Sequence, residues 1–285
     1  MKLLLTGAAG QLGKAILAQP AADCDIVACT RADLDLADAD AVRARIKSEQ
    51  PDWVINAGAY TAVDQAESEP ELAMAVNGHA PAALADALTQ TGGRLLQVST
   101  DFVFDGEARA PYLPGAARNP LSVYGRTKAA GEDGAGEQAI ILRTSWVYAA
   151  GGGNFVRTMA RLMRERDHLR VVADQIGTPS WAPEIARTIW ALIAKGQAGI
   201  YHHRDAGETS WHGFAQAIAE EALAVGLIER LPTIEAIPSC DYPTPAARPL
   251  YSVLDDSGTR ALLGDQTRDW RENLRSMLKE EKTLG

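Results

Sequence analysis

Short apolar runs alternate with longer segments of helical spacing through the first half of the chain. The segments between the runs, for example 37–50 and 71–91, are rich in alanine, leucine and charged residues. Strands buried on both faces read as continuous apolar runs, and the crossover helices between them supply the alternation. The pattern therefore predicts an α/β fold built on a parallel sheet. The runs assigned to strands are LLL at 3–5, DIVAC at 25–29, WVINAG at 53–58, RLLQVST at 94–100 and AIILRTSW at 139–146.

The composition and the hydrophobic pattern of the sequence change after about residue 151. Proline and aromatic residues cluster in GTPSWAPE, YHHRDAGETSWHGF and IPSCDYPTPAARPLYS, and the regular alternation fades. Loop-rich surfaces of this kind often carry specificity. We therefore expect a first domain over 1–148 and, over 149–285, mainly a second, smaller lobe that covers a ligand on the first. A segment near 178–200, with a helix over 182–195, is a candidate to return to the first sheet.

Composition limits the kinds of partner. The chain has 285 residues, a formal net charge of -9 and a pI near 5.1. These values argue against nucleic acid or an anionic membrane surface as a partner. No stretch approaches the roughly 18 to 20 apolar residues that span a bilayer. Cys24, Cys29 and Cys240 have no metal-type spacing, which suits a reducing compartment. We expect a cytoplasmic protein.

A glycine-rich loop directly follows the first apolar run. Gly7, Gly10 and Gly13, with Gln11 and Leu12 between the last two, open the next helix. Glycines permit a tight turn and a close approach of backbone to pyrophosphate, and a helix N-terminus offers unpaired N–H groups. Any strand-to-helix turn can use such glycines. At the first βα turn of an alternating chain, however, they favour a dinucleotide site in a Rossmann-like, doubly wound sheet.

The end of the second run bears on the choice of cofactor. An acid there would bind the adenine ribose of NAD, but the sequence offers Thr30 and Arg31. Arg31 favours NADPH, with a solvated strand-end arginine as the open alternative, so NADH also stays open. Other residues expected to line the cofactor are Asp35, Leu36, Ala57, Gly58, Ala59 and Tyr60.

Several further motifs resemble one family. From about Lys2 to Tyr251 the chain is similar to the extended short-chain dehydrogenase/reductases and, within them, to the dTDP-4-dehydrorhamnose reductases. The resemblance implies reduction of the 4-keto group of dTDP-6-deoxy-L-lyxo-4-hexulose to give dTDP-L-rhamnose, for nucleotide-sugar and cell-surface polysaccharide biosynthesis. The motifs are TGAAGQLG, NAGAYTAVDQAESEPELAMAVN, STDFVFDG, YGRTK, RTSWVY, NFVRTM, DQIGTP and YPTPAARP.

Tyr124 and Lys128 lie four residues apart in LSVYGRTKAAGE. Ketone reduction needs a hydride and a proton for the developing alkoxide. A free tyrosine is a weak acid, and a neighbouring positive charge lowers the pKa of its phenol. Positions i and i+4 share a helix face, so we expect Lys128 to lower the pKa of Tyr124 and to reach the nicotinamide ribose. Incidental packing of the two residues is the alternative.

The resemblance assigns further site residues. It implies that Thr100 binds the substrate carbonyl and helps to set the Tyr124 pKa, with Asp101 beside it, and that Val98 contacts the cofactor. The alternative, purely structural interpretations are a strand-end turn for Thr100 and Asp101, interlobe packing for Trp146 and a solvated side chain for Arg248. The residues expected to contact the sugar nucleotide are Thr100, Asp101, Phe102, Trp146, Asn154 and Arg248.

Phe102 separates two related reactions. Sugar-nucleotide 4,6-dehydratases, which this chain resembles in fold, carry a glutamate after Thr-Asp, and this chain has Phe102. The substitution favours a simple reductase. An NAD-dependent epimerase or dehydratase remains an alternative, as does a non-catalytic regulatory subunit of an S-adenosylmethionine synthetase. The glycine loop and the Tyr-x-x-x-Lys pair argue against that subunit.

The sequence also bears on metal binding and on the oligomeric state. Some family members pair through Mg²⁺ held by glutamates, and the corresponding places here read Ala15 and Pro183. A metal-bridged dimer is therefore doubtful. A homodimer of another kind and a monomer both stay open.

Overall fold

Among residues 1–264 and 267–284, which the computed structural model describes, six strands form one parallel sheet in the order β10-β5-β4-β3-β1-β2. The predicted Rossmann-like α/β fold is confirmed. The chain leaves β1 for β2 on one side and returns to β3 on the other, which makes the β1/β3 border the switch point where such sheets bind ligands. The strands are β1 Lys2–Thr6, β2 Asp25–Cys29, β3 Trp53–Asn56, β4 Arg94–Thr100, β5 Ile140–Thr144 and β10 Gly199–His202.

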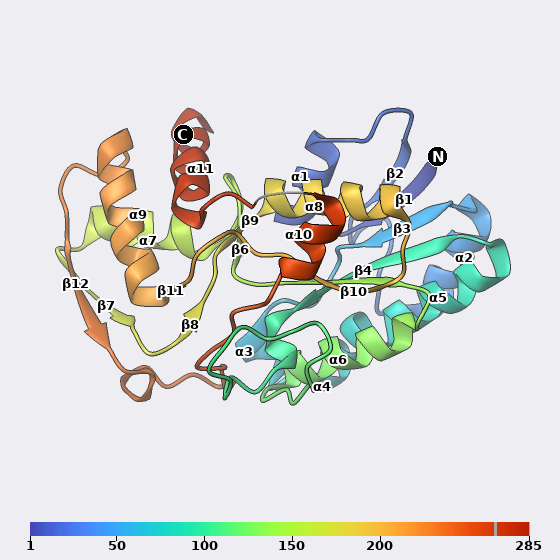
Figure 1. Ribbon diagram of the computed structural model, residues 1–285, viewed down its shortest axis with the longest axis horizontal. Coiled ribbons are helices and arrows are strands. Elements are labelled where there is room, and N and C mark those ends of the chain that lie inside the picture. The colour runs from blue at the N-terminus through green and yellow to red at the C-terminus, as the bar shows by residue number, and fades with distance from the viewer. Residues whose placement is uncertain (265–266, 285) are drawn as a thin grey trace.

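Helices cover both faces of this sheet (Figure 1). On one face α1 and α8 pack on Leu3, Leu5 and Leu142. On the other face α2, α5 and α6 pack together, and Leu4 and Ile141 belong to the core on that side. Successive side chains of a strand point to opposite faces of the sheet. Because helices cover both faces, the strand residues are apolar throughout. The helices are α1 Gln11–Ala18, α2 Ala39–Glu49, α3 Val63–Ala66, α4 Pro70–Met74, α5 Ala80–Thr91, α6 Val123–Ala135 and α8 Ala182–Lys195.

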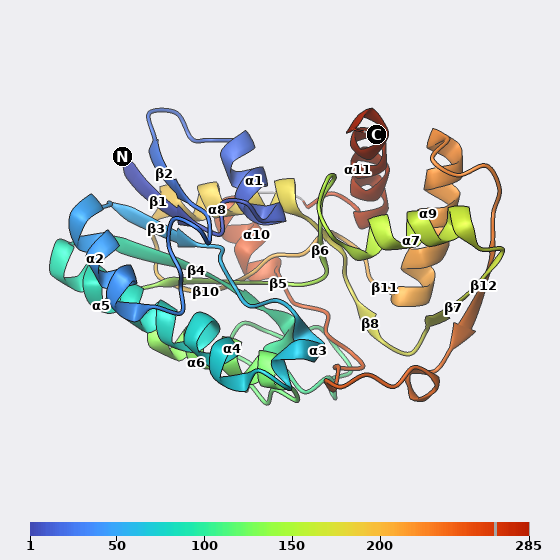
Figure 2. The same cartoon turned by 180° about the vertical axis from the view of Figure 1, so that it is seen from behind.

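A smaller lobe lies at one end of the sheet, as both ribbon views show (Figures 1 and 2). Its core joins α7, α9 and α11 and contains Phe214, Met159 and Leu274. The parallel pair β7 and β12 packs beside α9. The remaining elements are β6 Val147–Tyr148, α7 Phe155–Glu165, β7 His168–Val172, β8 Ile176–Gly177, β9 Ser180–Trp181, β11 Thr209–Ser210, α9 Trp211–Val225, β12 Thr233–Ile237, α10 Ser257–Leu263 and α11 Trp270–Leu284.

The chain passes between the lobes more than once. After β6 and α7 it returns to the large lobe, where α8 packs on α1 and β10 pairs with β5. The helix over 182–195 thus has the bounds expected from the sequence. The division at residue 148 stays a prediction, and residues 265, 266 and 285 of the expected second lobe lie outside the described residues.

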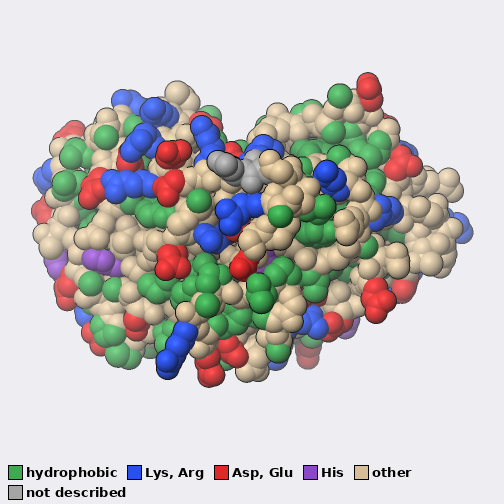
Figure 3. Space-filling view, viewed as in Figure 1, with side chains coloured by type: hydrophobic (Ala, Val, Ile, Leu, Met, Phe, Trp, Pro, Cys, Tyr) green, Lys and Arg blue, Asp and Glu red, His purple; other side chains and the backbone are tan. Residues whose placement is uncertain are grey.

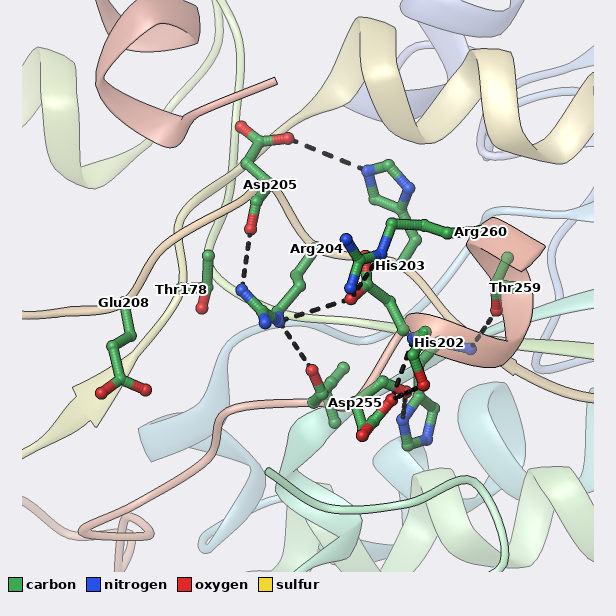
Figure 4. Close-up of polar contacts among 12 residues, drawn as sticks. Thr178, His202, His203, Arg204, Asp205, Glu208, Asp255, Thr259 and Arg260 are labelled. Carbon is green, nitrogen blue, oxygen red and sulfur yellow. Dashed lines mark hydrogen bonds and ion pairs between the residues drawn. The ribbon is translucent and has the colours of Figure 1, made fainter. Parts of the chain in front are cut away.

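Buried polar side chains follow the end of β10 (Figure 4). The Arg204 Nε donates to the Leu254 carbonyl at 2.7 Å. An Asp205 carboxylate oxygen accepts from the Trp181 backbone N–H at 3.1 Å, and the residue is fully buried. Burial raises the pKa of Asp205 to about 8. This cluster connects β10 to the segment before α8 and to the C-terminal part of the chain.

The surface carries charges of both signs. On the face in Figure 3, Lys and Arg side chains are interspersed with Asp and Glu, so this face has no broad basic area. None of the helices in the described part of the chain is long and apolar enough to span a membrane.

Candidate active site

A cavity of about 790 Å³ lies along the carboxyl ends of the sheet strands. Nearly all the residues singled out from the sequence line it, and Thr30 and Asn154 do not. Those that do are Gly7, Gly10, Gln11, Leu12, Gly13, Arg31, Asp35, Leu36, Ala57, Gly58, Ala59, Tyr60, Val98, Thr100, Asp101, Phe102, Tyr124, Lys128, Trp146 and Arg248. The structure thus brings the glycine loop, the Tyr-Lys pair and the sugar-side candidates to one place.

The glycine loop is shaped by close backbone contacts. Gly7 has φ +67°, and a Cβ added there would lie 2.6 Å from the Gly58 backbone nitrogen. A Cβ at Gly13 would collide with the Gly7 carbonyl oxygen. The Gly10 N–H closes the turn by donating to the Gly7 carbonyl at 2.9 Å. Side chains at Gly7 and Gly13 would disrupt this tight turn before the α1 N-terminus, and a tight turn at that place fits a dinucleotide pyrophosphate.

Arg31 and Thr30, which follow β2, differ in their placement. Arg31 lines the cavity, and no hydrogen bond or ion pair engages it elsewhere in the described part of the chain. Thr30 faces Asp33 instead: its Oγ1 and its backbone N–H both donate to Asp33 Oδ2, at 2.7 and 2.9 Å. These bonds fix the turn that carries Arg31. Asp35 and Leu36 follow in the cavity wall.

A π-helical turn, Ala75–His79, joins α4 to α5 and holds the loop after β3. Its Asn77 Oδ1 accepts from the Tyr60 N–H at 2.9 Å, and its Nδ2 donates to the Tyr60 carbonyl at 3.0 Å. The Nδ2 also reaches Thr127 Oγ1 on α6 at 3.2 Å. π-turns are rare and are frequently found at functional sites. Here the turn fixes the cavity wall at Tyr60 relative to the helix that carries Tyr124.

Tyr124 and Lys128 lie one turn apart on the same face of α6, whose N-cap is Ser122. Burial raises the pKa of Tyr124 to about 12, and a hydrogen bond with Thr100 opposes the shift. Burial lowers the pKa of Lys128 to about 8. The Lys128 Nζ donates to the Val98 carbonyl at 2.6 Å. The expected lowering of the Tyr124 pKa by Lys128 is therefore not seen in this state, since burial dominates. The phenol is protonated at neutral pH, which is the form that donates a proton.

An ion pair inside the fold lies on the same face of α6, one turn beyond Lys128. Glu132 accepts from Arg143 Nε and Nη2 at 2.7 and 2.6 Å, and from Ser99 Oγ at 2.6 Å. The side chains of Arg143 and Glu132 are 1% and 3% exposed. Val98 and Ser99, successive residues of β4, are thus bonded to successive turns of α6. Sequence reasoning missed Glu132, although its i+8 spacing from Tyr124 is a visible signal.

Thr100 and Asp101 end β4 beside the tyrosine. The Thr100 hydroxyl donates to Asp101 Oδ1 at 2.9 Å and accepts from the Phe102 N–H at 3.2 Å. Burial raises the pKa of Asp101 to about 6. The Phe102 ring meets Tyr124 edge-on, with centroids 5.5 Å apart. The part of the cavity beside Tyr124 therefore has an aromatic wall next to a buried carboxyl.

Trp146 has a second tryptophan beside it, Trp211, which sequence reasoning did not single out. Both line the cavity. Their rings stack with centroids 3.5 Å apart and planes 10° from parallel. Trp211 begins α9, and the cluster of aromatic residues around it, SWHGF, is the only local signal of its position.

Asn154 and Arg248 lie at the lobe border with partners already in place. The Asn154 Nδ2 donates to Gln11 Oε1 at 2.7 Å, so Asn154 holds a cavity residue without lining the cavity itself. Arg248 donates to both carboxylate oxygens of Asp64, from Nη1 at 3.0 Å and from Nη2 at 2.8 Å. The Ala246 N–H joins the same carboxylate at 3.2 Å. The expected pairing of Arg248 with a diphosphate would have to displace Asp64.

No group of three or more His, Cys, Asp or Glu side chains within residues 1–264 and 267–284 is arranged to hold a metal ion.

Comparisons with known proteins place this site in a family. The family model described as "RmlD substrate binding domain" matches residues 1–283. A dTDP-4-dehydrorhamnose reductase of Burkholderia thailandensis is 40% identical over 95% of this chain and 96% of its own. The chain belongs to the dTDP-4-dehydrorhamnose reductase family.

Solved structures of the family share the whole fold. The dTDP-4-dehydrorhamnose reductase of Clostridium acetobutylicum superposes with a TM-score of 0.93 at 36% identity, over 99% of this chain and 100% of that chain. The Bacillus anthracis enzyme, solved in complex with NADP, gives a TM-score of 0.92 at 33% identity, over 98% and 99%. The resemblance seen in the sequence motifs is thus confirmed over both lobes.

Proposed function

We propose that this protein reduces the 4-keto group of dTDP-6-deoxy-L-lyxo-4-hexulose to form dTDP-L-rhamnose, with NADPH as the preferred reductant. The observation that carries the proposal is the placement of Tyr124, beside Thr100, in the same cavity as the glycine loop. Relatives named dTDP-4-dehydrorhamnose reductase, at 37 to 42% identity, support it.

NADPH, when bound, supplies the hydride. The chain's own residues do the rest. Tyr124 is a protonated phenol at neutral pH, and it donates its proton to the oxygen of the reduced carbonyl. Thr100 orients that oxygen by hydrogen bonding next to the phenol. Lys128 is mostly protonated at pH 7, so its charge stabilises the phenolate that the donation leaves.

Arg31 supports the preference for NADPH. It lines the adenine end of the cavity, where a guanidinium favours a 2′-phosphate through charge-assisted bonds. The glycine loop, with Gly7 and Gly13 packed against backbone, would hold the pyrophosphate. Val98, Ala57 and Tyr60 would contact the rest of the dinucleotide.

The sugar side favours reduction over elimination. Phe102 stands where an acid would be needed at C5 and C6 of the sugar. Asp101, Phe102 and Trp146 would contact the deoxysugar, and Arg248 would bind the diphosphate once it has left Asp64. Asn154 would hold the side chain of Gln11 in the cavity wall by hydrogen bonding.

We also propose a cellular location and an oligomeric state. The free thiols Cys24, Cys29 and Cys240 support a cytoplasmic location. We infer a protein whose oligomer, monomer or homodimer, does not depend on Mg²⁺. Sedimentation with and without EDTA tests this, and dissociation of a dimer by EDTA would contradict it.

The test of function follows NADPH absorbance with enzymatically prepared ketosugar nucleotide. Wild type should consume NADPH in step with substrate, whereas an epimerase or dehydratase gives no net oxidation. Tyr124→Phe should lose about 10²- to 10⁴-fold in kcat. Tyr242→Phe, at a tyrosine that is 61% exposed, is the matched control. Absence of NADPH and NADH oxidation by wild type would overturn the proposal. Unchanged activity of Tyr124→Phe would favour the alternative hypothesis of a non-catalytic regulatory subunit.

A further inference from the structure

The backbone at Trp146 is strained. Its φ is +47°, in the left-handed region where a bulky side chain is a genuine outlier. Such conformations persist where the surrounding structure enforces them, and they gather at ligand sites. The residue sits between β5 and β6 and lines the cavity.

Hydrogen bonds fix the chain on both sides of the strained residue. The Ser145 hydroxyl donates to the Thr178 carbonyl at 2.8 Å. The Trp146 carbonyl accepts from the Ser180 N–H at 3.2 Å. These bonds anchor the backbone to the segment before α8, but they leave the indole ring to be placed by its own neighbours.

Trp211 supplies the surface against which that ring lies. The antiparallel pair Thr209↔Gly177 and Ser210↔Ile176 brings the start of α9 next to β8. Trp211 then stacks flat on Trp146 and is braced from behind by Phe155, with centroids 4.7 Å apart. One face of the Trp146 indole is thereby covered by protein.

Gly177 leaves room for the edge of the same ring. A Cβ there would lie 2.7 Å from two carbon atoms of the Trp146 indole. The glycine has no left-handed φ that would require it. Its role is therefore to let the indole approach the β8 backbone.

We propose that Trp211, with Gly177, is a positioning residue that holds Trp146 in its strained conformation so that the indole surface lining the cavity meets the apolar face of the 6-deoxysugar. The inference rests on the proposed function, because it specifies how the sugar part of that substrate is bound. An aromatic face packs on the C–H face of a pyranose, and the methyl group of a deoxysugar adds apolar area.

The experiment compares two ligands by calorimetry in wild type and variants. dTDP-L-rhamnose carries the sugar, and dTDP lacks it. Trp211→Leu removes the stacking surface and keeps apolar volume, so the Kd of dTDP-L-rhamnose should rise roughly 3- to 10-fold. The Kd of dTDP and of NADPH should stay within about two-fold. Gly177→Ala should give the same sugar-specific loss with Trp211 intact.

Two further variants separate positioning from general stability. Trp211→Phe keeps a ring on Trp146 and should restore wild-type binding. Trp190→Phe changes a tryptophan of α8 that does not line the cavity, and it should leave both Kd values unchanged. In kinetics, Trp211→Leu should raise the KM of the ketosugar nucleotide more than it lowers kcat.

The outcomes are distinct. Equal weakening of dTDP and dTDP-L-rhamnose in Trp211→Leu and Gly177→Ala, or no weakening of either, would overturn the inference while leaving the reductase intact. A wild-type protein that binds neither ligand would overturn the proposed function itself.

Discussion

Replacing Arg143 by methionine should destabilise the protein severely, although the residue lies outside the cavity. The variant removes both bonds from the guanidinium to Glu132, at 2.7 and 2.6 Å. Ser99 still donates to this carboxylate at 2.6 Å, and Arg118 reaches it at 3.3 Å from a side chain that is 29% exposed. A buried carboxylate is thus left without its main counter-charge.

The magnitude follows from the burial of both partners. Removing one partner of a buried ion pair costs about 3 to 5 kcal/mol, because the other charge stays desolvated. For a chain of this size each kcal/mol moves the melting temperature by about 2 to 4 °C. The expected loss is therefore roughly 6 to 20 °C. An exposed pair gives the matched control: Arg161 and Glu165 are 54% and 49% exposed, and Arg161→Met should cost less than about 1 kcal/mol.

Urea unfolding followed by circular dichroism measures both variants, and the double variant Arg143→Met with Glu132→Met isolates the cause. Two apolar side chains of similar volume leave no uncompensated charge, so the double variant should recover at least about half of the loss. A single variant that loses under about 1 kcal/mol, or a double variant no better than the single one, would refute the reasoning from charge burial.

Three other predictions concern pH, cofactor and ligand. Burial raises the pKa of Asp205 to about 8, above its unfolded value of about 4, so its contribution is fully present below pH 4 and is lost as pH rises toward 8. Urea unfolding from pH 4 to 9 should show a flatter dependence for Asp205→Asn, and parallel curves would contradict this assignment. Arg31→Ala should raise the KM of NADPH about 10-fold or more while that of NADH stays within about two-fold; an equal rise for both would place Arg31 away from the 2′-phosphate. Asp64→Asn weakens the hold on Arg248, so dTDP should bind more tightly in calorimetry, and weaker binding would show that Arg248 does not turn to the diphosphate.

The large lobe was predictable because its signals are local. The run at 94–100 is the strand β4 with the same bounds, and the helix over 182–195 is α8. β10 was not foreseen, because GIYH carries no apolar run and becomes a strand only by pairing with β5. Strand propensity depends on such context more than helix propensity does.

The same distinction applies to the site. The glycine loop and the Tyr124–Lys128 spacing are read within a dozen residues, and the structure brings them to one cavity. The position of Trp211 in the cavity wall depends on the pairing of β11 with β8. Its stacking partner is Trp146, a residue with left-handed backbone 65 positions earlier in the sequence. Asp64, whose carboxylate binds the Arg248 guanidinium, is 184 positions away from Arg248 in the sequence. No local pattern contains either contact.

The late pairing of β10 has a consequence for synthesis on the ribosome. The edge of β5 that β10 covers stays open until residues 199–202 have emerged, and the sheet face under α8 stays open until residues 182–195 have emerged. An unpaired strand edge invites association with other chains. Although N-terminal domains usually fold first during translation, this large lobe must wait for a strand made after α7. A nascent chain stalled before β10 should therefore be a preferred client of chaperones.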